Sequence, residues 1–188
     1  MRRNAGRVLG EYLVASAQAG STTALGQLAQ LWHPKLLAHA YRLIGDAEVA
    51  QDIAQDSWSD IIKGVRKLND SAAFPSWSYR IVSRRSVDAI RQIQRRRKIE
   101  AAYATEPSRE TVSAKSIEFA ADATPLSRAI AALPPPQRAT IALFYLEGFT
   151  VSEVAHALSV PSGTVKSRLM TARHSLRKSL EGDPNVHT

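Results

Sequence analysis

Apolar residues recur every three or four positions along most of this 188-residue chain, and no stretch alternates apolar and polar residues as a half-buried strand would. The pattern therefore predicts an all-helical protein. Two apolar patterns occupy the first part of the chain, roughly Tyr12 to Trp32 and Pro34 to Ile44. Gly45 then interrupts the pattern, and Asp46 is a residue type that commonly caps the start of a helix.

Two long helices with one apolar face each are expected next. The first runs from Ala47 to about Leu68, and its buried face is predicted to comprise Ala50, Ala54, Trp58, Ile61, Val65 and Leu68. Residues 69–75 form a loop. The second helix runs from about Pro75 to Lys98 and turns one side inward, with Ser78, Val82, Ser86, Ala89 and Ile93.

The helical pattern fades from Glu100 to Thr124, where Ala, Ser, Thr and Glu dominate. Such a composition predicts a flexible linker, with at most a transient helix around Ser116 to Ala121. Shorter helices are expected beyond it, at about 126–133, 137–146, 151–158 and 162–180. We therefore expect two small helical domains, at about residues 8–98 and 125–182, that move relative to each other about a flexible linker at residues 99–124.

The last two helices have the features of a helix-turn-helix. Thr150 and Glu153 are spaced as a capping box, and the segment 158–161 makes a tight connection to the next helix. That helix has an apolar stripe of Val165, Leu169, Ala172, Leu176 and Leu180. Its opposite face carries Gly163, Ser167, Met170, Thr171, His174 and Lys178, flanked by Lys166, Arg168, Arg173 and Arg177. Small polar groups bordered by cations suit base edges flanked by phosphates, although a solvated amphipathic helix would show the same stripe.

The charge of the chain favours a polyanionic partner, because 25 Lys and Arg residues outnumber 17 Asp and Glu residues and give a net charge of +8. Between Arg80 and Lys98 there are eight cations and one anion, Asp88. Like charges four residues apart destabilise a helix by roughly 0.2–0.5 kcal/mol per pair. A bound polyanion is the simplest explanation for such a stripe.

The preceding helix carries the opposite charge, with acids at four-residue spacing on the side away from its apolar face: Glu48, Asp52, Asp56 and Asp60. Acids near the start of a helix favour its dipole, but those further along do not. An acidic stripe repels DNA, so it favours a basic protein partner unless it is merely a solvated face.

Several kinds of function are disfavoured by composition. The absence of cysteine excludes disulfides, thiol catalysis and cysteine-containing metal sites. The five histidines show no metal-ligand spacing and no nucleophile stands beside a base, so we expect no enzyme, no cofactor and no small-molecule substrate. No apolar run reaches the ~18 residues of a membrane span, and the first residues do not resemble a secretory signal. We expect a cytoplasmic protein with no membrane span.

Taken together, these motifs resemble the sigma-70 family of bacterial RNA polymerase sigma factors, specifically its extracytoplasmic-function (ECF) group. The resemblance rests on four segments in order: Leu36 to Asp56; Phe74 to Asp88, including Trp77-Ser78-Tyr79-Arg80-Ile81; Leu133 to Thr150, opening with Leu133-Pro134-Pro135-Pro136-Gln137-Arg138; and Gly163 to Arg173. It implies that the first domain is sigma region 2 and that the second is the helix-turn-helix of region 4.

The resemblance also implies roles. The protein would bind core RNA polymerase, through its beta-prime and beta subunits, and promoter DNA, would answer a stress, and would be held by an anti-sigma factor. The polymerase-binding residues would be Glu48, Asp52 and Asp56. The minus-10 element would be met by Asn69, Asp70, Ser71, Phe74, Trp77, Arg80, Arg84 and Arg91. The minus-35 element would be met by Gly163, Thr164, Lys166, Ser167, Met170, Thr171, Arg173 and His174.

Two alternatives stay open from the sequence. A helix-turn-helix regulator that acts without binding polymerase would need neither the acidic stripe nor the second basic helix. An enzyme acting on DNA, such as a recombinase, would need a catalytic group that does not stand out here.

The chain departs from the family's usual pattern at three places. Ser83-Arg84 stands where Arg-Asn is usual, so minus-10 contacts are expected to differ. Ser159 stands where the helix-turn-helix usually has Gly, which predicts a strained or reshaped turn. Thr171 stands where many members carry a cation, which predicts a minus-35 preference of its own.

Overall fold

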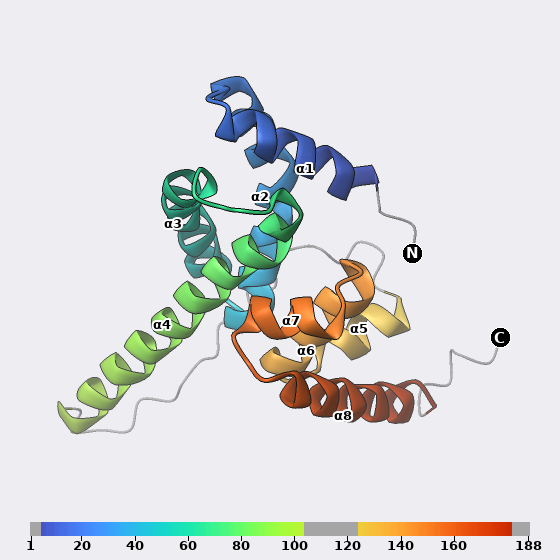
Figure 1. Cartoon of the computed structure of the whole chain (residues 1–188). Helices are drawn as coiled ribbons and strands as arrows, with labels where there is room; N and C mark the ends of the chain where they lie inside the picture. The colour runs from blue at the N-terminus through green and yellow to red at the C-terminus, as the bar shows by residue number, and fades with distance from the viewer. Residues whose placement is uncertain (1–4, 104–123, 182–188) are drawn as a thin grey trace.

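The computed structural model describes residues 5–103 and 124–181, and all regular structure in these two ranges is helical (Figure 1). The first group of elements comprises α1 (Ala5–Gln18), α2 (Thr22–Ile44), α3 (Ala47–Val65), the 3-10 turn η1 (Ser71–Ala73) and α4 (Phe74–Tyr103). The second comprises α5 (Pro125–Ala131), α6 (Pro135–Ile141), the π-helical turn η2 (Ala142–Leu146), α7 (Val151–Leu158) and α8 (Ser162–Glu181). The prediction of two small all-helical domains is confirmed. The helix expected around Ser116 to Ala121 lies outside the described residues.

The first helical break was predicted in the wrong place. The chain breaks at Gly20, which has a φ of 102°, and Ser21 then caps α2 by accepting a hydrogen bond from the Ala24 amide at 3.1 Å. Pro34 lies inside α2 and does not end it. Proline removes one backbone donor, but here it is exposed, and the burial of Trp32 on one side of it and Leu36 on the other keeps the helix continuous.

The boundaries of the later helices are close to those predicted. Asp46 caps α3, accepting from the Val49 amide at 3.0 Å, and Gly45 ends α2 with a φ of 78°. Helix α4 extends to Tyr103, five residues beyond the predicted end. The predicted inner faces of α3 and α4 are buried or half-buried at every position that was named.

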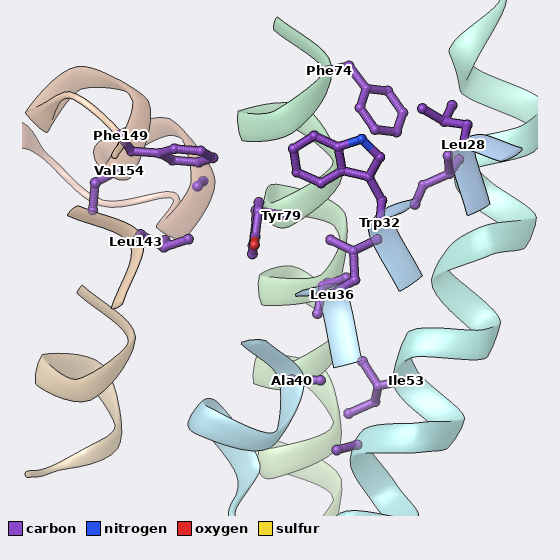
Figure 2. Close-up of a cluster of buried hydrophobic side chains, with 14 of the residues drawn as sticks. Leu28, Trp32, Leu36, Ala40, Ile53, Phe74, Tyr79, Leu143, Phe149 and Val154 are labelled. Atoms are coloured by element: carbon purple, nitrogen blue, oxygen red, sulfur yellow. The ribbon is translucent and has the colours of Figure 1, made fainter. Parts of the chain in front are cut away.

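Aromatic side chains from α2 and α4 make the centre of the first helical group (Figure 2). Trp32 meets Phe74 edge-on at a centroid distance of 5.6 Å and Tyr79 at 6.3 Å. All three rings are almost completely buried. Contacts of this kind add to the apolar burial that fixes α4 against α2.

The two groups of helices share this core. Phe149, which precedes α7, is 3% exposed, and its ring meets Tyr79 edge-on at 5.4 Å (Figure 2). Helix α7 packs against α4, and α6 packs against α2. The sequence predicted two domains free to move, whereas this structure packs them together through an aromatic contact between residues 70 positions apart.

Candidate nucleic-acid and polymerase interface

The helix-turn-helix is formed by α7 and α8, as predicted. The Glu153 amide donates to Thr150 Oγ1 at 3.2 Å, and the Thr150 amide donates to Glu153 Oε2 at 2.7 Å, which completes the capping box. Partial burial acts to raise the pKa of the Glu153 carboxyl. The hydrogen bonds from the Thr150 backbone and from Arg7 together outweigh burial, so the pKa lies below its ordinary value and the carboxylate stays charged.

The turn between the two helices is strained, as its serine predicted. Ser159 has a φ of 53° and a ψ of 45° and is the one non-glycine residue with positive φ in the described parts of the chain. Its amide still reaches the His156 carbonyl at 3.2 Å, so the turn keeps its hydrogen bond. Glycine would adopt this left-handed conformation without strain, whereas serine does so at a cost of about 1 kcal/mol.

The recognition helix α8 presents the predicted outer face to solvent. The apolar stripe is inside: Val165, Leu169 and Ala172 are buried, while Leu176 and Leu180 are half-buried. Seven of the eight predicted minus-35 residues are exposed and Thr164 is half-buried, and Met170 is 69% exposed. The Ser167 hydroxyl donates to the Thr164 carbonyl at 3.0 Å, which leaves its oxygen free to accept from a base.

One cation beside this face is held in place by an aromatic ring. The Arg173 guanidinium lies 5.9 Å from the centroid of the Tyr145 ring, which is itself 54% exposed. A cation over a ring face is attracted by the quadrupole of the ring, so this contact partly orders the Arg173 side chain.

Helix α4 carries the predicted basic stripe, and Arg80, Arg84 and Arg91 are all exposed. Arg91 approaches Asp88 at 3.6 Å within the same helix. The aromatic residues predicted for the minus-10 element, Phe74 and Trp77, are less exposed than these arginines. Phe74 is 1% exposed and packed on Trp32, so in this arrangement its ring does not face solvent.

Trp77 is half-buried, and its place depends on a glycine of α3. A Cβ atom added at Gly64 would lie 2.6 Å from the Trp77 ring, closer than atoms approach in proteins. One edge of the indole therefore packs directly on the α3 backbone at Gly64. The role of Trp77 and Phe74 at the minus-10 element stays a prediction.

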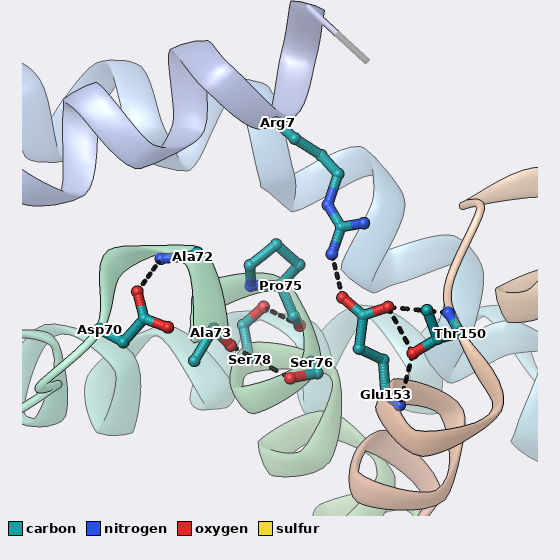
Figure 3. Close-up of polar contacts among 9 residues, drawn as sticks. All are labelled: Arg7, Asp70, Ala72, Ala73, Pro75, Ser76, Ser78, Thr150 and Glu153. Atoms are coloured by element: carbon teal, nitrogen blue, oxygen red, sulfur yellow. Dashed lines mark hydrogen bonds and ion pairs between the residues drawn. The ribbon is translucent and has the colours of Figure 1, made fainter. Parts of the chain in front are cut away.

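The loop that precedes α4 is ordered by a short cap. Asp70 accepts from the Ala72 amide at 2.9 Å and starts η1 (Figure 3). Asn69 and Asp70 are exposed and Ser71 is half-buried. Two of the three loop candidates therefore have side chains open to solvent at the start of the basic helix.

The acidic stripe of α3 is exposed, as expected, but part of it already has a cationic partner. Arg85 of α4 donates to Asp60 Oδ2 at 3.0 Å from Nε and 2.8 Å from Nη2, and its Nη1 lies 3.4 Å from Asp56 Oδ2. The same three side chains line an open groove between α3 and α4 with a volume of about 780 Å³. Glu48 and Asp52 lie one to two turns earlier, and both are exposed.

Ser83, one of the three departures from the family pattern, lies inside the protein. Its hydroxyl is 2.9 Å from Nε2 of His39, and both side chains are buried. Burial, and secondarily the positive charge of Arg42, lower the pKa of His39 to about 3, so this imidazole is neutral. An arginine at position 83 would bring a charge into this buried contact. The small, uncharged side chain of Ser83 therefore fits beside neutral His39, whereas the neighbouring Arg84 side chain is exposed to solvent.

The sequence analysis did not predict the ion pairs between distant segments of the chain that involve Arg85, Arg7 and Glu147. Arg85 was counted among the cations of α4 but not singled out, because its two acidic partners lie on another helix. Arg7 and Glu147 make contacts that join the two helical groups. Periodicity reports which face of a helix is buried, not which helix it faces.

Within residues 5–103 and 124–181, no group of three or more His, Cys, Asp or Glu side chains is placed to hold a metal ion. The same ranges contain no helix of sufficient length and apolarity to cross a membrane.

The helix-turn-helix and the second basic helix define a DNA-binding protein with two separate basic surfaces. Comparison with known proteins identifies the family of DNA-binding proteins to which the chain belongs. The model of sigma-70 region 2 matches residues 28–97, and the model of sigma-70 region 4 matches residues 124–176. The chain is 30% identical over 169 residues to the ECF RNA polymerase sigma factor SigM of Mycobacterium tuberculosis, covering 89% of this chain and 83% of SigM.

A second relative and one solved structure agree with this. The ECF RNA polymerase sigma factor SigW of Bacillus subtilis is 27% identical over 176 residues, which cover 89% of this chain and 94% of SigW. The sigma factor RpoE of Bartonella quintana, solved in complex with the anti-sigma factor NepR, superposes with a TM-score of 0.64 at 23% identity, over 84% of this chain and 97% of that one. The chain belongs to the ECF group of the sigma-70 family of RNA polymerase sigma factors.

Proposed function

We propose that this ECF sigma factor has three separate binding surfaces. Region 2 comprises about residues 8–98, and region 4 comprises about residues 125–182. The acids of α3, Glu48, Asp52 and Asp56, bind a basic surface of core polymerase. The α4 stripe and the loop before it meet the minus-10 element. The outer face of α8 reads the minus-35 element.

The observation that carries this proposal is the opposite charge of two neighbouring helices. The exposed acids of α3 and the exposed arginines of α4 lie on adjacent helices of one small bundle. A protein that met only DNA would gain nothing from the acidic surface, because it repels phosphate. A helix-turn-helix regulator that acts without polymerase is therefore disfavoured.

The remaining features follow from this proposal. The protein acts by binding and catalyses no reaction itself, it works in the cytoplasm where core polymerase is found, and a stress signal controls it. An anti-sigma factor holds it in reserve. The fold supports this last point by analogy, since the Bartonella quintana protein of similar fold was solved with such a partner.

Charge reversal on α3 tests the polymerase-binding surface. Because Arg85 already pairs with Asp56 and Asp60, the acids without such a pairing should carry more of the binding. Asp52→Lys should weaken binding to core polymerase at least about 30-fold, since like charges set against each other cost several kcal/mol. Asp60→Lys should weaken it less.

The matched control is Glu181→Lys, which makes the same change of charge at the exposed end of α8. Binding is measured by titrating labelled protein with core polymerase, and circular dichroism checks that each variant is folded. Equal binding by Asp52→Lys and wild type would refute the assignment.

A further inference from the structure

The last residue of α1 contacts the backbone just before the loop that is proposed to meet the minus-10 element. We call residues 69–73 the minus-10 loop, after that proposed role. Helix α1 itself precedes the residues matched to sigma-70 region 2. At its C-terminal end, the Gln18 side-chain amide donates to the Val65 carbonyl at 3.0 Å and to the Leu68 carbonyl at 2.7 Å. One side chain of α1 therefore bridges the turn that leads from α3 into the minus-10 loop.

This bridge uses the full donor capacity of the Gln18 amide. An amide nitrogen carries two N–H groups, and here each has one carbonyl as its acceptor. The last carbonyls of a helix lack partners within the helix and must find them elsewhere. The side chains of Gln18 and Leu68 are both half-buried, so water replaces these hydrogen bonds less readily than it does at an open surface.

The backbone that carries Gln18 is fixed by the end of α1. The Gly20 amide donates to the Ala17 carbonyl at 3.0 Å, and the Ser21 amide donates to the Ser16 carbonyl at 3.1 Å. Gly20 has a φ of 102°. These two hydrogen bonds around a glycine with positive φ form a Schellman motif, a common helix C-terminus. Gln18 therefore reaches the turn from a backbone position that is already well defined.

The far end of the minus-10 loop is also fixed. The turn η1 packs against α1, and Asp70 starts it by accepting from the Ala72 amide at 2.9 Å (Figure 3). Phe74 follows and is buried against Trp32. Asn69 and Asp70 lie between these two fixed ends, and both are exposed. A short segment held in this way loses little conformational freedom when it binds a ligand.

We propose that Gln18 is a positioning residue for recognition of the minus-10 element: it acts through the minus-10 loop, whose shape it fixes. The inference rests on the proposed function of that loop. Loss of the Gln18 amide should reduce discrimination between bases more than it reduces overall affinity. The exposed arginines of α4 still contact the phosphates in such a variant, and phosphate contacts carry no sequence information.

Three substitutions of Gln18 separate its hydrogen bonds from its packing. Gln18→Met keeps the length of the side chain and removes both donors, and Gln18→Glu sets a carboxylate against two carbonyl oxygens. Both should lower the ratio of affinities for the preferred and the substituted base by about three- to tenfold, as for the net loss of one hydrogen bond. Gln18→Lys supplies N–H donors again and should restore much of the ratio. Gln27→Met is the matched control, because it makes the same change at an exposed position of α2.

Amide hydrogen exchange on the full-length protein reports on the loop itself. Peptides that cover residues 66–73 should exchange faster in Gln18→Met and Gln18→Glu than in wild type, Gln18→Lys and Gln27→Met. Peptides from α8 should exchange equally in all five proteins. Circular dichroism checks folding, and Gln18→Asn, whose amide is one methylene shorter, takes the place of any variant that does not fold.

Discrimination between bases is measured on holoenzyme assembled from core polymerase and each variant. Mapped transcripts define the minus-10 element, and single-stranded fragments with each base at each position are then titrated. Unchanged exchange at residues 66–73 in Gln18→Met and Gln18→Glu would overturn the proposal. Faster exchange with an unchanged ratio of base affinities would overturn the role of Gln18 in recognition.

The proposed function of the loop is tested separately by Asn69→Ala and Asp70→Ala. Unchanged base preference in both of these variants would count against a role of the loop at the minus-10 element. Hydrogen exchange in the Gln18 variants would still decide whether Gln18 holds the loop in place.

Discussion

Helices α4 and α8 are both basic and both proposed to contact promoter DNA, yet they stand in very different surroundings. The outer face of α8 is open along its length, from Gly163 to Lys178. The beginning of α4 is packed against α7, and Arg85 further along ties it to the acids of α3. The arginines of α4 are exposed, but the aromatic residues proposed to act with them are packed against other helices. The proposed minus-35 face is therefore open almost throughout, whereas the proposed minus-10 face is open at its cations and at part of the loop before α4.

The two helices also differ in how they are fixed to the protein. Helix α8 follows the strained turn at Ser159 and buries only the small and aliphatic side chains Val165, Leu169 and Ala172, whereas α4 is fixed by large buried rings such as Tyr79. Changes at α8 should therefore act on recognition, and changes around α4 should act on the stability of region 2. Four predictions sharpen that contrast.

The largest effect is expected from base contacts of α8. Replacing Ser167 or Thr171 with Ala should change the preferred minus-35 sequence, with a loss of about 1–3 kcal/mol, or roughly 5- to 150-fold, at the affected base pair. Both side chains are exposed on the outer face. Binding of each variant to a library of minus-35 sequences measures this, and an unchanged ranking of sequences would show that these side chains do not read bases.

The next effect concerns the buried histidine beside α4. The pKa of His39 in the folded protein is about 3, below the ordinary value near 6.5 expected in the unfolded chain. The unfolded state therefore binds the proton first, so the stability that depends on neutral His39 is present above about pH 6.5 and is lost as the pH falls toward 3. Through this group, lowering the pH from 7 to 5 should reduce the free energy of unfolding of the protein by about 2 kcal/mol.

Urea unfolding of wild type and His39→Gln at several pH values isolates that contribution. The glutamine variant should be less stable at pH 7 but should lose less stability between pH 7 and pH 5. Parallel pH profiles of the two proteins would mean that His39 does not titrate on unfolding as described.

A smaller and different effect is expected at the cations beside the reading face of α8. Lys166→Ala or Arg173→Ala should weaken binding to every minus-35 sequence alike and reduce the slope of log affinity against log salt by about one unit. Arg173 is partly ordered by Tyr145, so its loss should cost more than that of Lys166. A variant that altered sequence ranking without changing the salt slope would contradict the assignment to phosphate.

The smallest effect is expected at the turn itself. Ser159→Gly should stabilise the protein by about 0.5–1 kcal/mol, because glycine relieves the left-handed strain but adds freedom to the unfolded chain. Ser152→Gly, in the first turn of α7 and exposed, is the matched control and should destabilise by about 0.5 kcal/mol. If both substitutions destabilise equally, Ser159 is not strained.

The sequence was sufficient for the helices, their inner faces and the exposed face of α8, because each depends on local spacing and capping. Thr150 and Glu153, for example, form their capping box within one turn. It was insufficient where partners come from distant segments. Arg85 pairs with acids 25 and 29 positions earlier, and Arg7 pairs with Glu153 across 146 positions. Nothing in the local pattern of either arginine specifies such a partner.

Packing also decided which predicted site residues are open. Phe74 and Trp77 were selected as aromatic residues beside cations, but their burial follows from Trp32 and Gly64 on other helices. Ser83 was noted as a departure from the family pattern, and its reason, the buried contact with His39, is visible only in three dimensions.

The division of promoter contacts between α8 and α4 is tested most directly by binding to two DNA fragments. Mapping the transcripts made by core polymerase with this protein defines the two promoter elements, and a minus-35 duplex and a minus-10 single strand are then titrated separately. Thr171→Ala should weaken binding to the duplex roughly 5- to 150-fold and leave binding to the strand unchanged, whereas Arg84→Ala should weaken binding to the strand alone. Equal losses on both fragments in either variant would contradict the account.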